Sequence, residues 1–127
     1  GGTMMFIETV NAPKAIGAYS QGVKKGNMVF TSGQLPIDPA SGELISGDIV
    51  RAVKVSLENV LAIVEEAGGK KTDIVKVTVF VSDISKFPQI NEEYGKFFGE
   101  HKPARSLVEV AKLPKGGEIE IEAVAVI

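Results

Sequence analysis

Two neighbouring stretches of the chain decide the fold: DIVRAVKVSLENVLAIVEEA at residues 48–67 and VKVTVFV at residues 75–81. In the first stretch, apolar side chains recur every three or four residues, which is typical of a helix with one buried face. Gly68-Gly69 follow directly, and glycine commonly ends a helix. In the second stretch, valine occupies every other position, the period of a β-strand. These patterns predict a helix over 48–67 that leads into a strand of the central sheet.

The remaining elements extend this core in both directions. We predict further strands at residues 5–10, 17–23, 28–32, 105–110 and 118–127. A second helix is predicted from a cap at Asp83 or Ser85 to Gly99, with Pro88 tolerated in its first turn. Its apolar face comprises Phe87, Ile90, Tyr94, Phe97 and Phe98. Because strand–helix–strand crossovers are right-handed, the sequence predicts an α+β fold in which two helices pack on one face of a six-stranded mixed sheet.

The last predicted strand indicates which side chains face away from the helices. The helix side takes Ile119, Ile121, Ala123, Ala125 and Ile127, and the opposite side takes Glu118, Glu120, Glu122, Val124 and Val126. Phe80 also points away from the valine row of its strand. An exposed sheet face with this much apolar surface usually marks association. We therefore predict a homo-oligomer built on that face.

The composition limits the class of protein. The 127 residues fit one domain spanning 1–127, in which Gly1-Gly2-Thr3 look like an expression remnant. A net charge of −2 does not favour a nucleic-acid partner, and no stretch is long and apolar enough to span a membrane, so we predict a cytoplasmic protein. The chain has no cysteine and a single histidine, His101, which we interpret as a solvated surface residue. No metal site and no cofactor are predicted.

An arginine and several carboxylates remain as candidate site residues. Arg105 and Glu120 lie on neighbouring predicted β-segments, and a guanidinium beside a carboxylate suits a small-acid site. The pattern alone leaves alternatives open for both residues. Arg105 equally fits an interface salt bridge, and the acidic period around Glu120 fits a solvated strand face. By the same reasoning Tyr19 reads as a packed ring and Asn91 as a surface residue.

Six motifs, in order along nearly the whole chain, resemble the RidA (YjgF) family of reactive-imine deaminases. They are Asn11-Ala12-Pro13 with Ile16-Gly17-Ala18-Tyr19-Ser20-Gln21-Gly22, then Thr31-Ser32-Gly33-Gln34-Leu35-Pro36, residues 73–81, Pro103-Ala104-Arg105-Ser106, Leu113-Pro114-Lys115 and Ile119-Glu120-Ile121-Glu122-Ala123. Several independent segments in the same order are more specific than any single motif.

The resemblance implies a homotrimer of chorismate-mutase-like protomers with pockets at the subunit boundaries. It also implies hydrolysis of 2-imino acids, such as 2-iminobutanoate and 2-iminopropanoate, to 2-oxo acids and ammonia. By the same resemblance Arg105 holds the substrate carboxylate and Glu120 orients or activates water. The other residues implied to line the pocket are Tyr19, Ser32, Gly33 and Asn91.

Two departures from the family pattern bear on substrate preference. The connection at residues 100–103 is shorter than in several relatives, and Leu107 replaces a frequent cysteine. Two alternative functions stay open. One is an endoribonuclease or translation inhibitor, which some family members are called, and the other is a non-catalytic trimer that binds small acids.

Overall fold

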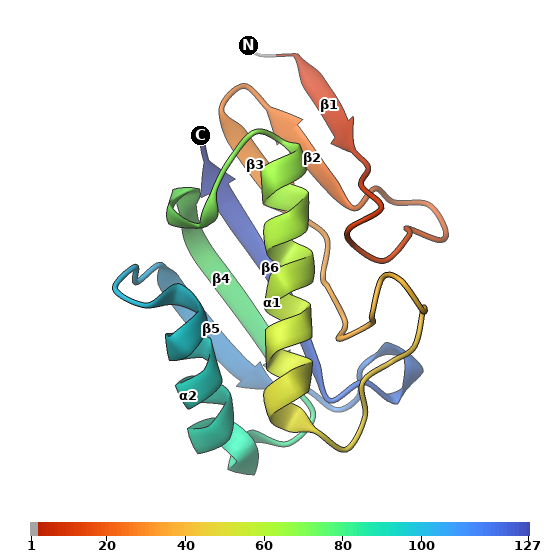
Figure 1. Ribbon diagram of the computed structural model, residues 1–127, viewed down its shortest axis with the longest axis vertical. Coiled ribbons are helices and arrows are strands. Elements are labelled where there is room, and N and C mark those ends of the chain that lie inside the picture. Colours follow the sequence, from red (N-terminus) through yellow and green to blue (C-terminus); the bar gives the residue numbers. More distant parts are fainter. Residues whose placement is uncertain (1–2) are drawn as a thin grey trace.

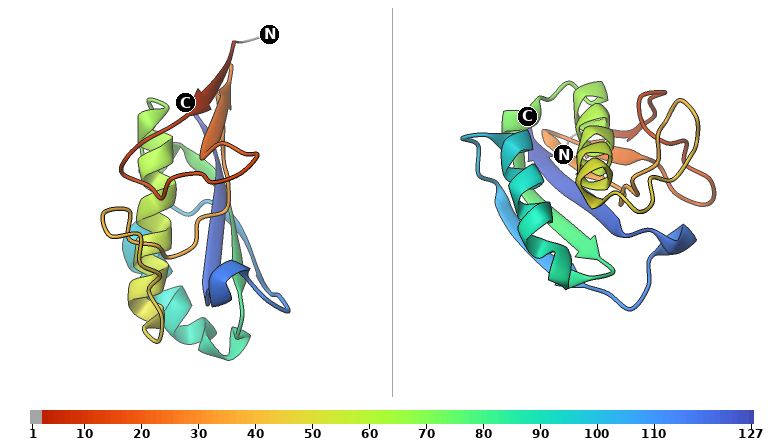
Figure 2. Two further views of the ribbon diagram at one scale, coloured as in Figure 1. Left: turned by 90° about the vertical axis from the view of Figure 1, so that its right-hand side faces the viewer. Right: turned by 60° about the horizontal axis from the view of Figure 1, so that its bottom comes forward.

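The computed structural model describes residues 3–127 as one mixed sheet with two helices on the same face (Figure 1; Figure 2, left). Gly1 and Gly2, which we interpreted with Thr3 as an expression remnant, lie outside the described residues. The strands are β1 (Met4–Ile7), β2 (Gly22–Lys25), β3 (Met28–Thr31), β4 (Ile74–Val81), β5 (Ala104–Glu109) and β6 (Ile119–Val126), and the helices are α1 (Ile49–Glu66) and α2 (Phe87–Phe98). The strands run in the order β1-β2-β3-β6-β4-β5, with β4 and β5 parallel and the other neighbours antiparallel. The predicted fold class is confirmed.

Helix α1 forms where the helical period indicated. Its N-cap is Asp48, whose carboxylate accepts a hydrogen bond from the backbone N–H of Arg51, and its C-cap is Ala67. Its buried side chains pack on the sheet, with Val53, Leu57 and Ile63 almost fully excluded from solvent. The second predicted helix divides into a short 3₁₀ turn, Ile84–Lys86, capped by Asp83, and α2 itself.

The second predicted strand is mostly wrong. Residues 17–21 form a loop, and β2 begins only at Gly22. The cause is the buried Gln21, whose Oε1 accepts from the backbone N–H of Thr9 and whose Nε2 donates to the carbonyls of Thr9, Ala12 and Pro13. These bonds satisfy backbone groups that would otherwise pair in a sheet, so β1 also ends earlier than predicted, at Ile7.

The two faces of the sheet divide as the alternation predicted, except at two strand ends. Val75 is exposed beside a bulge in β4, and Ile127 is exposed after β6 ends. Val77, Val79 and Val81 are fully buried under the helices, and so are Ile119 and Ile121. In Figure 2 (left) both helices lie on one side of the sheet, and no helix within residues 3–127 covers the opposite face. Its exposed apolar side chains include Met28, Phe30, Val108 and Val126. The homo-oligomer expected on this face stays a prediction.

Two further features concern individual predictions. His101 is half-buried, and its Nε2 lies 2.7 Å from the carbonyl oxygen of Ile74. The interpretation of His101 as a solvated residue is therefore wrong, because the ring fastens the connection after α2 to the start of β4. Neither helix within residues 3–127 has both the length and the apolar character needed to cross a membrane.

Candidate active site

Arg105 lies on the edge strand β5, on the helix side of the sheet. It pairs with Val77 of β4, whose side chain is buried under the helices, and residues paired across strands share a face. The guanidinium Nη1 donates a hydrogen bond to Oδ1 of Asn91 on α2, at 3.0 Å. Among the described residues no carboxylate lies within 4.0 Å of this guanidinium. Arg105 therefore keeps most of its donors available within one protomer.

Two aromatic rings of α2 complete the surroundings of Arg105. Its Cζ lies 4.8 Å from the ring centroid of Tyr94 and 5.7 Å from that of Phe87. Reasoning from the sequence assigned both rings only to the apolar face of the helix. The spacing 87, 91 and 94 places all three residues on one helical face, a signal that would have linked the rings to Asn91.

Glu120 lies on β6, on the face of the sheet that the helices leave open. It pairs with Phe80 and lines a cavity of about 830 Å³ together with Tyr19, Ser32 and Gly33. Ser32 is fixed to the preceding loop, since its Oγ donates to the carbonyl of Ser20 at 2.6 Å and its N–H to that of Gln21 at 2.8 Å. Four of the six predicted site residues thus share one cavity.

The Glu120 carboxyl group is partly buried and unpaired. No hydrogen bond or ion pair reaches it from elsewhere in residues 3–127, and only burial and the charge of Glu122 act on it. Burial raises the pKa of Glu120 above its ordinary value, and the neighbouring charge of Glu122 raises it further. A carboxylate that is costly to ionise and free of partners has the character of a proton acceptor rather than of a structural anchor.

Gly33 gives the Glu120 side chain its space. A Cβ at this position would lie 2.8 Å from Cδ of Glu120 and closer still to its Oε1. Replacing Gly33 with alanine is expected to displace the Glu120 carboxylate. It should lower kcat/KM for imine hydrolysis, the activity that the family resemblance implies, about tenfold. The Tm should change little, because only the flexible end of a side chain must move. Steady-state kinetics and thermal denaturation measure the two effects.

The matched control is Gly95→Ala in α2, where an added Cβ meets nothing within 4 Å. This change is expected to leave kcat/KM unchanged and to stabilise the helix slightly. Equal losses of activity in the two variants would contradict the steric role of Gly33.

Arg105 and Glu120 do not meet within one protomer. Strand β4 separates β5 from β6, so the expectation that the two residues occupy neighbouring strands is wrong. Their partners on β4, Val77 and Phe80, are three residues apart and therefore point to opposite faces. The two candidate half-sites of the chain are therefore Arg105 with Asn91 at the sheet edge and Glu120 with its neighbours on the open face.

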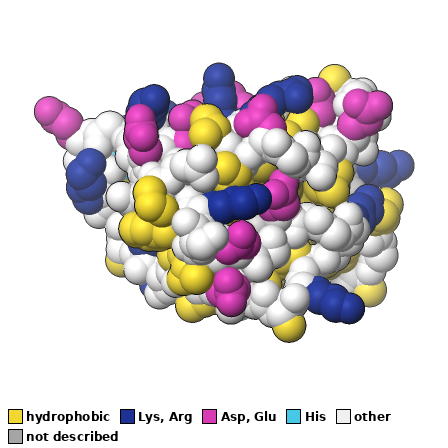
Figure 3. Space-filling view, turned by 90° about the horizontal axis from the view of Figure 1, so that it is seen from below, with side chains coloured by type: hydrophobic (Ala, Val, Ile, Leu, Met, Phe, Trp, Pro, Cys, Tyr) yellow, Lys and Arg dark blue, Asp and Glu magenta, His cyan; other side chains and the backbone are white. Residues whose placement is uncertain are grey.

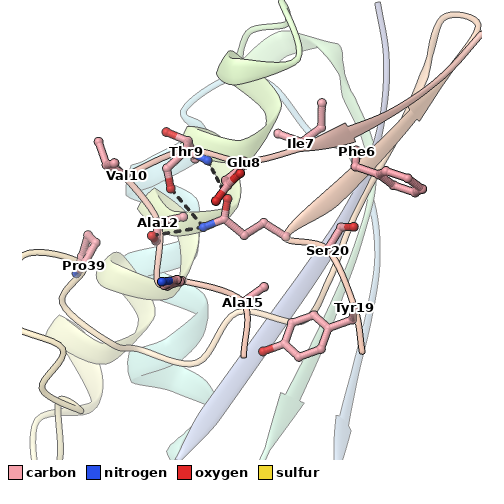
Figure 4. Close-up of a pocket in the computed structure, with 12 residues that line it drawn as sticks. Phe6, Ile7, Glu8, Thr9, Val10, Ala12, Ala15, Tyr19, Ser20 and Pro39 are labelled. Atoms are coloured by element: carbon pink, nitrogen blue, oxygen red, sulfur yellow. Dashed lines mark hydrogen bonds between the residues drawn. The ribbon is translucent and has the colours of Figure 1, made fainter. Parts of the chain in front are cut away.

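Tyr19 is a boundary between two cavities. It is 54% exposed and lines the Glu120 cavity as well as a second cavity of about 570 Å³, shown in Figure 4 between Phe6 and Pro39. The hydrogen bonds between the Gln21 side chain and the backbone of Thr9 hold the loop that carries Tyr19. The interpretation of Tyr19 as a packed ring is wrong, because its ring stands open to solvent at the mouth of the site.

Comparison with known proteins gives close matches over nearly the whole chain. The profile of the family described as Endoribonuclease L-PSP matches residues 9–127. The 2-iminobutanoate/2-iminopropanoate deaminase of Escherichia coli K12 is 56% identical over 123 residues, covering 94% of this chain and 95% of that protein.

Two solved structures are similar over the same length. The YjgF gene product of E. coli is 55% identical, with a TM-score of 0.93 over 96% of this chain and 98% of that one. The TdcF protein of E. coli with bound serine is 52% identical, also with a TM-score of 0.93, over 97% of this chain and 98% of that one.

Proposed function

Because the chain belongs to the Endoribonuclease L-PSP family, also called the RidA or YjgF family, we propose that it is a 2-iminobutanoate/2-iminopropanoate deaminase. In this reaction a 2-imino acid is hydrolysed to a 2-oxo acid and ammonia. Two features carry the proposal: Arg105 has no carboxylate partner within residues 3–127, and the carboxyl group of Glu120 in the other half-site has a raised pKa. The E. coli deaminase, 56% identical, supports the choice of substrate.

The proposed mechanism uses only side chains of this protein. Arg105 binds the substrate carboxylate through its planar fork of N–H donors, and Asn91 holds the fork in place. Water attacks the electrophilic imine carbon while Glu120 accepts a proton from it. The proton passes to the nitrogen of the resulting carbinolamine. The carbon–nitrogen bond then breaks as the hydroxyl group returns its own proton to Glu120, so that the carbonyl of the 2-oxo acid forms and ammonia leaves. Tyr19, Ser32 and Gly33 shape the cavity in which the water and the reacting carbon meet.

We further propose that the protein is a homotrimer whose active sites lie between subunits. The opposite placement of the two half-sites supports this arrangement, since Arg105 of one protomer and Glu120 of another can face one pocket where a single protomer cannot join them. The exposed apolar side chains on the open sheet face supply surface for such an interface. Sedimentation as a monomer at micromolar concentration would contradict the proposal.

Mixing two inactive variants tests the shared site directly. Arg105→Ala and Glu120→Gln are each expected to be inactive alone, but a one-to-one mixture refolded together should recover about a quarter of the wild-type rate. The reason is that random assembly pairs an intact Arg105 with an intact Glu120 in about one site of four. Each variant refolded alone is the control. A mixture no more active than the two separate variants would mean that one protomer supplies both residues.

The deaminase activity itself is tested by coupling to threonine dehydratase, which releases 2-iminobutanoate. The protein is expected to accelerate the appearance of 2-oxobutanoate beyond the uncatalysed hydrolysis of the imine. An unchanged rate at saturating dehydratase would contradict the proposed function.

Two other functions have specific support. The family description and its endoribonuclease name favour an RNA-cleavage assay, although the face in Figure 3 intersperses acidic and basic side chains rather than forming a basic stripe. RNA cleavage by pure protein that disappears in the Arg105→Ala variant would establish it. The serine bound to TdcF favours a non-catalytic protein that binds small acids. In that case Glu120→Gln would leave the affinity for small acids unchanged.

A further inference from the structure

The guanidinium of Arg105 is held by uncharged groups. Of the contacts made by the described residues, one is the hydrogen bond to Asn91 and the others are the ring faces of Tyr94 and Phe87. An acidic neighbour would fix the side chain equally well, but it would also neutralise the charge that a substrate carboxylate requires. Ring faces attract the cation and leave its N–H edge free for a planar anion.

Tyr94 is the better placed of the two rings. Its centroid is the nearer to Cζ of Arg105, at 4.8 Å against 5.7 Å for Phe87. It is only 8% exposed and packs against the ring of Phe98 at 4.9 Å, so its position is set by the core. Phe87, at the start of α2, is 36% exposed. Tyr94 therefore connects the rigid interior to Arg105.

The hydroxyl of Tyr94 plays no part in this contact. It is buried, and nothing in residues 3–127 forms a hydrogen bond with it. Burial raises the pKa of Tyr94 and outweighs the opposite effect of the Arg105 charge, so the phenol stays neutral at physiological pH. The ring face thus makes the direct contact with Arg105, and the hydroxyl forms no hydrogen bond to it.

We propose that Tyr94 is a positioning residue that holds Arg105 in its substrate-binding orientation through its ring face and not through its hydroxyl. The inference rests on the proposed function in so far as Arg105 binds the substrate carboxylate. Without the Tyr94 ring, the guanidinium keeps its hydrogen bond to Asn91 but can adopt several orientations. Ordering it in the substrate-binding orientation then costs binding free energy. The effect falls on substrate binding, and hence on KM more than on kcat.

The test compares Tyr94→Phe with Tyr94→Leu. Tyr94→Phe keeps the ring and is expected to stay within about twofold of wild type, whereas Tyr94→Leu is expected to raise KM for the imine about tenfold with a smaller change in kcat. The control is Phe97→Leu, which removes a ring of the same helix that covers Lys71 rather than Arg105. It should leave KM unchanged, and thermal denaturation corrects both leucine variants for lost packing.

A second readout does not depend on activity. The chain has two arginines, Arg51 and Arg105, so the Nε–Hε signals in a ¹⁵N spectrum are assigned with a single Arg51→Lys variant. The Arg105 signal should be shifted by the ring in wild type and in Tyr94→Phe. In Tyr94→Leu it should move toward the position of the exposed Arg51.

The outcomes separate this inference from the proposed function. An unchanged Arg105 signal in Tyr94→Leu, or a Tyr94→Phe variant that behaves like Tyr94→Leu, would overturn the positioning role. If the Arg105 signal moves as expected in Tyr94→Leu but the wild-type protein has no deaminase activity, the positioning role is supported and only the proposed function is overturned.

Discussion

Arg105→Ala is expected to lower kcat/KM for 2-iminobutanoate by roughly a hundredfold or more, equivalent to about 3 kcal/mol of transition-state binding. The substrate carboxylate would enter a half-site that offers the Asn91 amide and two ring faces but no positive charge. The coupled assay with threonine dehydratase measures the loss. Because the side chain makes no ion pair within the described residues, the fold should survive the change, and circular dichroism should be that of wild type.

The chain contains a matched control for this experiment. Arg51 is the other arginine; it is exposed on α1 and does not line the Glu120 cavity, so Arg51→Ala should leave kcat/KM unchanged. Arg105→Lys keeps the charge but not the planar fork, so it should recover only part of the lost affinity. Full activity in Arg105→Ala would remove the arginine from the mechanism and leave the protein without an identified carboxylate anchor.

The fold was largely predictable because its signals are local. The helical period of residues 48–67 and the valine alternation of residues 75–81 were sufficient to predict α1 and β4, and the rule for crossover handedness placed both helices on one face. The exception is the segment 17–21, where one buried glutamine outweighs the strand propensity of its neighbours. A hydrogen bond between the Gln21 side chain and the backbone of Thr9, twelve residues away, produces no periodic pattern of apolar residues in the sequence.

The sequence named the candidate site residues but not their arrangement, and their roles stay predictions. The family motifs pointed to Arg105, Glu120 and their neighbours, and the structure gathers four of these residues around one cavity. The separation of Arg105 from Glu120 depends on which strands become neighbours, and the insertion of β4 between β5 and β6 is a long-range pairing. The contact of Tyr94 with Arg105 likewise requires β5 to lie beside α2, which spacing within the helix cannot specify.

Glu120→Gln is expected to lower kcat about a hundredfold or more while leaving the binding of 2-oxobutanoate within a few-fold of wild type. The amide keeps the shape of the side chain against Gly33 but cannot accept the proton of the attacking water. Stopped-flow or steady-state kinetics measure the first effect, and calorimetry with 2-oxobutanoate measures the second. Loss of binding together with turnover would instead make Glu120 part of the anchor.

The raised pKa of Glu120 predicts two pH dependences, one of activity and one of stability. Wild-type kcat should fall as the pH drops through a pKa above the ordinary 4.5, and Glu122→Gln should move this fall to lower pH without changing the plateau, because it removes the neighbouring charge. The free energy of unfolding should change with pH in the opposite direction to kcat. The folded state favours protonated Glu120, so its ionisation costs stability as the pH rises from about 4.5 through the higher folded-state pKa.

Glu120→Gln should therefore unfold at a higher temperature than wild type at neutral pH, and the difference should disappear below about pH 4.5. Thermal denaturation across this range measures it, and Glu122→Gln, which only removes the neighbouring charge, should show a smaller rise of the same sign. A lower Tm at neutral pH would mean that the carboxylate has a stabilising partner, across a subunit boundary or elsewhere. A higher Tm with lost turnover would mark Glu120 as a residue kept for catalysis at the expense of stability.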